Sequence, residues 1–293
     1  MVTDRLKYTA RLLRRSARRL RQSLRFAGLG TAPVLFANSF PKSGTHLLTQ
    51  VMDGFTRFGP AVDSGLPAVV TFDGFTGRRR STAEILADLR RFQPGDIGYG
   101  HVHALPEAVE LLCQPGYCAF FILRDPRDVV VSHVHYIAEM APDHIHHRYY
   151  HEILQTFDER LRASIAGVPA DQLALAAAGR PVYEPLPDIR ARFEPYLGWL
   201  ERPEVLALRY EDLMTHRAAA LERIYNHAVW RGFQAACSHD DALGWLAASI
   251  DPKRSPTFRS GKTGGWRAVF TPEHQALFEQ VSGDLLDRMG YEA

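Results

Sequence analysis

The feature that most constrains this chain is a short polar loop between two apolar segments near the N-terminus. Residues 34–37 are apolar and have polar flanks, as in a buried strand, and residues 46–55 have the apolar spacing of a helix. Between them, residues 41–45 read Pro-Lys-Ser-Gly-Thr. A glycine-containing turn from strand to helix presents main-chain N–H groups at the positive end of the helix dipole, so this loop predicts an anion-binding site.

The rest of the chain repeats the alternation of strand and helix. We predict further strands at residues 97–102, 117–123 and 205–208. We predict helices over residues 81–91, 106–112, 126–140, 217–231, 241–249 and 272–289. This order is typical of an α/β fold with a central parallel β-sheet flanked by helices, in which ligands bind at the carboxyl ends of the strands.

The composition excludes several other classes of protein. The 293 residues are 46% hydrophobic and 23% charged, which is typical of a globular protein and not of a disordered or fibrous one. Three scattered cysteines do not form a disulfide framework. The sequence has no apolar run of about 18 residues and no secretory signal at its N-terminus, so we expect a cytoplasmic protein.

Positive charge is concentrated in an N-terminal arm, residues 1–30. The arm contains nine Lys and Arg and one acidic residue, whereas residues 31–293 contain 26 basic and 32 acidic residues. Leucines at close to seven-residue spacing predict that the arm is one amphipathic helix, separate from a single domain over residues 31–293. Three roles remain open for it: peripheral contact with anionic lipid, nucleic-acid binding, or packing against the acidic body.

A second candidate anion site follows the apolar run of residues 117–123. Arg124 stands at the end of that run, and Ser132 lies eight residues later in the next predicted helix. An arginine fork together with a hydroxyl suits a terminal phosphate group. We assign the neighbouring Arg127 and Asp128 a structural role, in which they cap the helix and form salt bridges on it.

A third basic segment, residues 256–266, is rich in glycine and contains Arg259 and Lys262. With the loop at residues 41–45 and the segment that starts at Arg124, it resembles the three signatures of cytosolic-type sulfotransferases. Those enzymes use 3′-phosphoadenosine 5′-phosphosulfate (PAPS). The resemblance covers about residues 33–290 and implies a P-loop-like sulfotransferase fold. It also implies transfer of a sulfuryl group from PAPS to a hydroxyl acceptor, which the sequence leaves open among a small molecule, a carbohydrate and a glycolipid.

The resemblance also assigns roles to individual residues. Lys42 stabilises the leaving phosphate oxygen, and Ser132 belongs to the catalytic set as well. The residues implied in holding PAPS are Lys42, Ser43, Gly44, Thr45, His46, Arg124, Ser132, Tyr210, Arg259, Ser260 and Gly261. No metal is expected, because sulfuryl oxygens carry less charge than phosphoryl oxygens and a lysine can replace magnesium.

Three positions depart from the family pattern. Leu47 stands where the animal cytosolic enzymes place a tryptophan against the adenine. Ser260 replaces a lysine beside the 3′-phosphate, and Gly265 replaces an aspartate. Lys262 is a nearby replacement for the lost positive charge.

The expected general base is a histidine at the end of the second predicted strand. His101 and His103 both lie there, and residues two apart point to the same face of a strand. We favour His101, because it lies nearer the strand end and the resemblance places the catalytic histidine there. Six more histidines fall in residues 133–151. No cysteine or clear carboxylate accompanies them, so we expect them to line the acceptor pocket or the surface and not to bind zinc.

Two other classes of function remain. A P-loop kinase or other nucleotide phosphotransferase needs a Gly-Lys-[Ser/Thr] motif, whereas Lys42 precedes Gly44 by two positions. A non-catalytic adaptor would act through the basic arm, on a membrane or a nucleic acid. The acidic body repels nucleic acid, so we expect no nucleic-acid partner.

Overall fold

The computed structural model describes residues 2–174, 185–254 and 261–292. Its main sheet has the strand order β2-β6-β1-β7-β8, with β3 also paired to β6, and the pairs within this sheet are parallel. The strands are β1 (Val34–Ser39), β2 (Val62–Asp63), β3 (Val69–Val70), β6 (Asp96–His101), β7 (Tyr117–Leu123) and β8 (Val205–Arg209). The predicted parallel sheet is therefore confirmed, and its four longest strands are the four expected from apolar runs.

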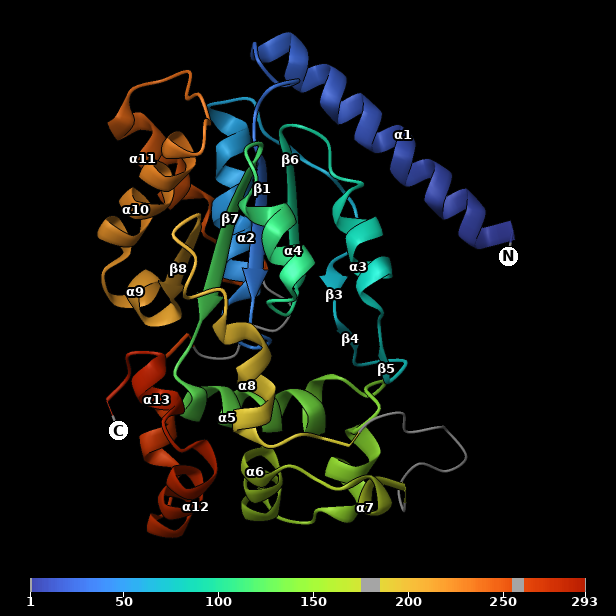
Figure 1. Cartoon of the computed structure of the whole chain (residues 1–293), viewed down its shortest axis with the longest axis vertical. Helices are drawn as coiled ribbons and strands as arrows, with labels where there is room; N and C mark the ends of the chain where they lie inside the picture. Colours follow the sequence, from blue (N-terminus) through green and yellow to red (C-terminus); the bar gives the residue numbers. More distant parts are fainter. Residues whose placement is uncertain (1, 175–184, 255–260, 293) are drawn as a thin grey trace.

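Helices connect the strands and extend beyond the carboxyl edge of the sheet (Figure 1). They are α1 (Val2–Arg25), α2 (Thr45–Gly54), α3 (Thr82–Leu89), α4 (Pro106–Cys113), α5 (Pro126–His135), α6 (Phe157–Ala166), α7 (Ala170–Ala174), α8 (Ile189–Leu197), α9 (Tyr210–Thr215), α10 (Arg217–Trp230), α11 (His239–Ser249), α12 (Pro272–Ser282) and α13 (Leu285–Arg288). The last two were predicted as one helix. They are separate because Gly283 takes φ 56 and ends the first.

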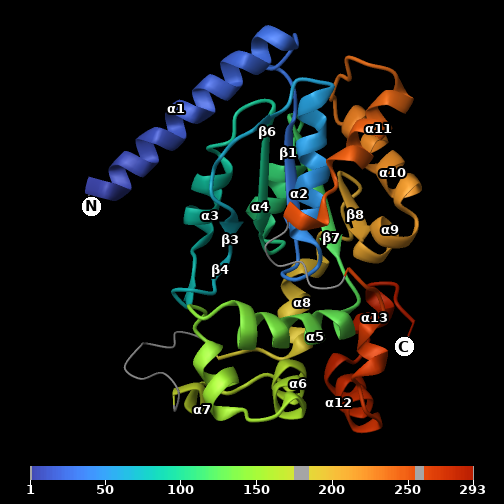
Figure 2. The same cartoon turned by 180° about the vertical axis from the view of Figure 1, so that it is seen from behind.

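Alternate residues of each long strand enter cores on opposite faces of the sheet. In β1, Phe36 belongs to the core that α3 and α4 complete, whereas Leu35 and Ala37 belong to the core that α2, α10 and α11 complete. Figure 1 shows α4 in front of the sheet, and Figure 2 shows α2 on the other face. Because both faces are covered, β7 and residues 34–37 of β1 are apolar on both sides, as buried parallel strands require.

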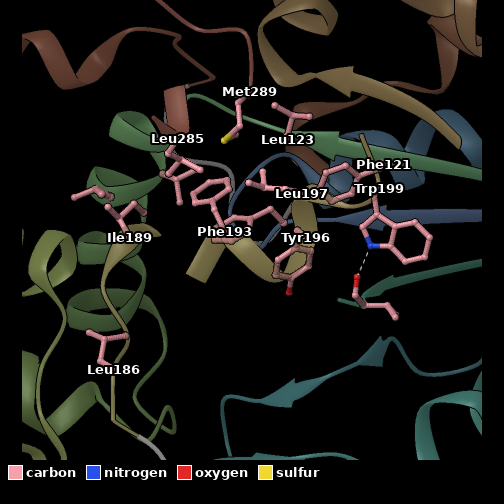
Figure 3. Close-up of a cluster of buried hydrophobic side chains, with 14 of the residues drawn as sticks. Phe121, Leu123, Leu186, Ile189, Phe193, Tyr196, Leu197, Trp199, Leu285 and Met289 are labelled. Atoms are coloured by element: carbon pink, nitrogen blue, oxygen red, sulfur yellow. Dashed lines mark hydrogen bonds between the residues drawn. The ribbon is translucent and has the colours of Figure 1, made fainter. Parts of the chain in front are cut away.

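Aromatic side chains of α8 and the turn after it support the loops at the carboxyl edge. Phe193 stacks on Phe40, the residue that follows β1, with ring centroids 3.6 Å apart. The indole of Trp199 donates a 2.8 Å hydrogen bond to the carbonyl of Val102, the residue after β6 (Figure 3). Trp199 is 1% exposed. These contacts fix where the chain leaves β1 and β6, and so they position both loops.

The N-terminal arm forms the 24-residue helix α1, as its leucine spacing predicted. It lies against β2 and extends away from the body of the molecule (Figure 1). Within the described part of the chain, no helix combines the length and the apolar character needed to cross a bilayer.

Candidate active site

The loop between β1 and α2 has the backbone of an anion cradle. Lys42 takes φ 69 and Gly44 takes φ 102, both in the left-handed region. A Cβ atom at Gly44 would lie 2.6 Å from Cδ2 of Tyr210, so only glycine fits there. The Ser43 hydroxyl is buried, and among the described residues it has no hydrogen-bond partner. The first-turn N–H groups of α2 also lack helical acceptors, so the loop can offer donors to a bound anion.

The Lys42 side chain leaves this loop and reaches the segment after α5. Its Nζ atom lies 3.9 Å from the centroid of the Tyr136 ring. Tyr136 begins a short π-helical turn (Tyr136–Met140) that continues α5. A cation over an aromatic face is attracted to it, so Tyr136 holds the ammonium group at the edge of the loop. No local sequence pattern predicts this contact, because the two residues are 94 positions apart.

A chain of hydrogen-bonding groups connects the loop to His101. Ser39 Oγ lies 2.8 Å from Thr45 Oγ1 and 3.1 Å from His101 Nδ1. His101 Nδ1 also lies 2.9 Å from the carbonyl oxygen of Ser39. A carbonyl only accepts, so Nδ1 carries the proton and Nε2 keeps its lone pair. His101 is therefore oriented as a proton acceptor next to the loop.

Burial lowers the pKa of His101 below its usual range, and the charges of nearby His46 and Lys42 lower it further. The hydrogen bond to the Ser39 carbonyl acts in the opposite direction. The imidazole is therefore neutral at neutral pH, as a general base must be.

His103 occupies a different environment from His101. Strand β6 ends at His101, so the alternation of a strand does not extend to His103. The His103 ring packs edge-on against Tyr196, with centroids 4.7 Å apart, and its main-chain N–H donates to Thr71 Oγ1. We expected both rings to line one cleft because alternate residues of a strand point to the same face. Since β6 ends at His101, this reasoning does not extend to His103.

Tyr210, the first residue of α9, lies between two of the predicted motifs. Its ring packs against Gly44, and the Arg124 guanidinium lies 4.7 Å from its centroid. Burial raises the pKa of Tyr210, so the phenol is neutral. The ring thereby brings the loop after β1 next to the arginine after β7.

Asp128 of α5 attaches the third motif to the second. Its side chain is 2% exposed and accepts hydrogen bonds from the N–H groups of Gly264, at 2.8 Å, and Trp266, at 3.0 Å. It also lies 3.3 Å from Arg124, which donates to the Lys262 carbonyl at 2.9 Å. The three segments, widely separated in sequence, therefore meet at the carboxyl edge of the sheet. Asp128 therefore has the structural role and the salt bridge that were predicted, but the predicted helix cap is Asp125 and not Asp128.

The remaining candidate residues are placed as follows. Ser132 is partly buried on α5, and His46 is exposed on the first turn of α2. Partial desolvation and then the Lys42 charge lower the pKa of His46. Gly261 is partly buried with φ 63. Arg259 and Ser260 lie outside the described residues.

Three more residues singled out in the sequence are placed by the structure: Arg127, Leu47 and Gly265. Arg127 pairs with Asp125, the residue that caps α5, at 3.0 Å, which confirms its structural role. Leu47 packs at the edge of the core on the α2 side of the sheet. At Gly265, a Cβ atom would lie 3.6 Å from Asp128 Oδ1.

The histidines in residues 133–151 form contacts with one another and with neighbouring polar groups. His133 Nδ1 lies 2.8 Å from Ser164 Oγ, and His147 stacks on His151 with centroids 5.2 Å apart. His146 is buried, and burial lowers its pKa to about 3. In the described ranges, no three His, Cys, Asp or Glu side chains are grouped to hold a metal ion.

The structure thus combines a parallel sheet, an anion cradle after its central strand β1 and an arginine after the neighbouring strand β7. No family model matches the chain, and no curated protein matches it. Among solved structures, it is similar to a mouse sulfotransferase, SULT7A1, complexed with PAP. The TM-score is 0.56 at 17% identity, over 90% of this chain and 89% of that one.

The chain is also similar to retinol dehydratase, solved with PAP and either androsterone or retinol. Each of these matches has a TM-score of 0.55 at 16% identity and covers 92% of this chain and 85% of that one. The chain therefore has the P-loop-like sulfotransferase fold that the sequence motifs implied.

Proposed function

We propose that this protein is a PAPS-dependent sulfotransferase that transfers a sulfuryl group to a hydroxyl acceptor. The observation that carries the proposal is the link from Thr45 through Ser39 to His101, which sets an imidazole with an unprotonated Nε2 beside an anion cradle. A kinase does not require this pairing, because its transferred group is held by metal ions.

The cradle fits the phosphosulfate end of PAPS. The buried Ser43 hydroxyl lacks a partner in the described part of the chain, and Gly44 lets the backbone approach an anion. We assign Lys42, Thr45 and His46 to the same end. The PAP found in the solved neighbours is the nucleotide that remains when PAPS loses its sulfuryl group.

The other end of the nucleotide is assigned to the second and third motifs. Arg124 and Ser132 bind the 3′-phosphate, together with residues 259–261. In support, Arg124 is fixed by Asp128 and by the carbonyl of Lys262, which belongs to the third segment. We assign the Tyr210 ring to the adenine, and its position between the cradle and Arg124 supports this assignment.

The chemistry then follows from these groups. His101 Nε2 takes the proton of the acceptor hydroxyl as its oxygen forms a bond to sulfur. The bond between sulfur and the bridging oxygen breaks, and the electron pair remains on the 5′-phosphate of the nucleotide. The Lys42 ammonium stabilises that negative charge, as pre-positioned cations do in phosphoryl transfer. No metal ion is assigned to the reaction.

The acceptor is a hydroxyl compound. Retinol dehydratase was solved with retinol and with androsterone, which supports a small-molecule acceptor for this fold. A carbohydrate hydroxyl or a lipid hydroxyl is the alternative. The acceptor screen described below distinguishes these three classes of acceptor.

The test has a binding arm and a transfer arm. Calorimetry should detect PAP binding in the presence of a metal chelator, and Lys42→Met should weaken it. Intact-mass screening of acceptor mixtures with labelled PAPS should then show one class of compound gain a sulfuryl group. Absence of PAP binding contradicts the proposal, as does ATP binding that depends on magnesium.

A further inference from the structure

Helix α1 is attached to the body through its polar face. Arg15 and Arg19 both pair with Asp96, the first residue of β6, whose side chain is fully buried. The Arg19–Asp96 distance is 2.7 Å, and Arg18 reaches Asp63 at 2.8 Å. These pairs are the packing against the acidic body that the charge distribution had suggested.

Hydrogen bonds to main-chain carbonyls extend this attachment along the helix. Gln22 is 8% exposed, and its amide donates to the carbonyls of Thr56, at 2.8 Å, and Gly59, at 3.1 Å. Arg25 donates to the carbonyl of Arg57 at 2.8 Å. The docked face of α1 is therefore fixed by specific polar contacts and contains no large apolar side chain among residues 14–25.

The opposite face of α1 is apolar and points to solvent. Leu20 is 63% exposed and Leu24 is 82% exposed. They lie one turn apart, with exposed Ala17 on the same side, and about half a turn around the helix from Arg15 and Gln22. A helix packed on a globular body normally turns its apolar stripe inward. Here the orientation is reversed, so the stripe remains available for another apolar surface.

The charged residues beside the apolar stripe indicate what kind of surface the stripe binds. Arg14 and Arg21 are both exposed. They are seven residues apart, so they lie on the same side of the helix, where they flank the leucine stripe. Asp4 is the only acidic residue in residues 1–30, so a second copy of this helix offers a single carboxylate against nine basic side chains. An apolar stripe with a cationic edge is the pattern of a helix that lies in the interface of an anionic bilayer.

We propose that α1 binds an anionic membrane surface through the Leu20–Leu24 stripe and the Arg14 and Arg21 edge. Its opposite face carries the enzyme body. Asp96 begins β6 and His101 ends it, so the attachment point and the candidate base lie at opposite edges of the sheet, about 17 Å apart along the strand. Membrane contact through α1 therefore does not involve the end of β6 that carries His101.

The test uses the full chain and vesicles of phosphatidylcholine, with and without phosphatidylserine. The full chain should sediment with the anionic vesicles, and Leu20→Ser with Leu24→Ser should weaken this binding by at least about tenfold. Phe75→Ser is the matched control, because Phe75 is 60% exposed on the β4–β5 hairpin (Phe72–Asp73 and Arg78–Arg79), away from α1. It should bind like the unaltered chain.

Further outcomes decide between lipid and self-association. Arg14→Gln with Arg21→Gln should weaken binding to the anionic vesicles and reduce its salt dependence. All the altered side chains are exposed, so the melting temperature should stay constant. Equal sedimentation of the full chain and the double serine variant overturns the proposal. So does a dimer in sedimentation velocity that the serine variant abolishes, without any vesicle binding.

Discussion

The Nδ1 atom of His101 lies 2.9 Å from the carbonyl oxygen of Ser39, the last residue of the neighbouring strand. Because β1 and β6 are parallel and adjacent, their carboxyl ends bring these residues together. The hydrogen bond fixes the tautomer of the ring and directs Nε2 away from β1. The main-chain contact does not depend on the side chain at position 39 and is set by the pairing of β1 and β6, whereas the 3.1 Å contact with Ser39 Oγ depends on the serine.

His101→Asn should abolish turnover and leave PAP binding within about threefold of the wild type, because the imidazole acts on the acceptor and not on the nucleotide. We expect kcat to fall by at least about a hundredfold, measured with labelled PAPS. His103→Asn is the control and should retain most of the activity. If His103→Asn is the inactive variant instead, the base has been misassigned.

The pH profile provides a second test of His101. Burial lowers its pKa below the usual value near 6.5, so the base stays unprotonated at mildly acidic pH. We expect the acid limb of kcat to lie below pH 6.5, where activity falls as pH decreases. A limb above pH 7 would contradict a buried neutral base.

Lys42→Met should reduce kcat by two to three orders of magnitude, about the effect of removing a positioned charge from a transition state. Tyr136→Leu removes only the ring beneath the ammonium, 3.9 Å away, and should cost about threefold to thirtyfold. Single-turnover rates with bound PAPS measure both. If the Tyr136→Leu variant is as active as the wild type, the ring does not position Lys42.

Gly44→Ala should weaken PAP binding at least about tenfold, because a Cβ atom would meet the Tyr210 ring at 2.6 Å and move either the cradle or the ring. Gly116→Ala is the matched control. Gly116 has a similar φ of 92, but a Cβ there meets nothing within 4 Å. Both variants should lose about 1 kcal/mol of stability from backbone strain. Only Gly44→Ala should lose PAP affinity in calorimetry, and equal affinities would argue against the cradle.

The sequence predicted those parts of the fold that depend on contiguous apolar runs. Strands β1 and β7 are buried on both faces, so their residues 34–37 and 117–123 carry a strong local signal. Strands β2 to β5 have two residues each and were not predicted, because pairs that short are formed by tertiary contacts. Helices α6 and α8 were missed as well, although Thr156 caps the first with a capping box that the sequence contains.

Within the candidate site, the sequence found the loops but not the contacts between them. Ser39 stands at the polar end of an apolar strand next to the anion loop, and that position was an available signal for its link to His101. The contact of Lys42 with Tyr136 had no such signal, because it depends on the path of the chain after α5. Local patterns predict where a loop begins, whereas packing decides which side chains meet there.

Asp128→Asn should detach the third motif from α5. The carboxylate accepts two main-chain N–H bonds and lies 3.3 Å from Arg124, so the amide loses one acceptor and leaves Arg124, whose side chain is 14% exposed, without its charge partner. We expect a loss of roughly 3 kcal/mol in urea unfolding, with weaker PAP binding. Asp212→Asn is the control, since that side chain is 35% exposed and its ion pair with Arg223 is 3.5 Å long. It should cost less than about 1 kcal/mol, and equal losses would contradict the anchoring role.

His146 should make the protein less stable in acid. It is buried, its ring nitrogens have no hydrogen-bond partner in the described part of the chain, and burial lowers its pKa to about 3. Below pH 6.5, His146 therefore binds a proton in the unfolded chain but not in the folded chain. As a result, the free energy of unfolding is highest above pH 6.5 and falls as pH decreases toward 3. This histidine alone should cost about 2 kcal/mol between pH 7 and pH 5, measured by urea unfolding at both pH values. His146→Leu should reduce that loss, whereas His151→Leu, at an exposed position, should not, and equal pH dependence in the two variants would refute the assignment.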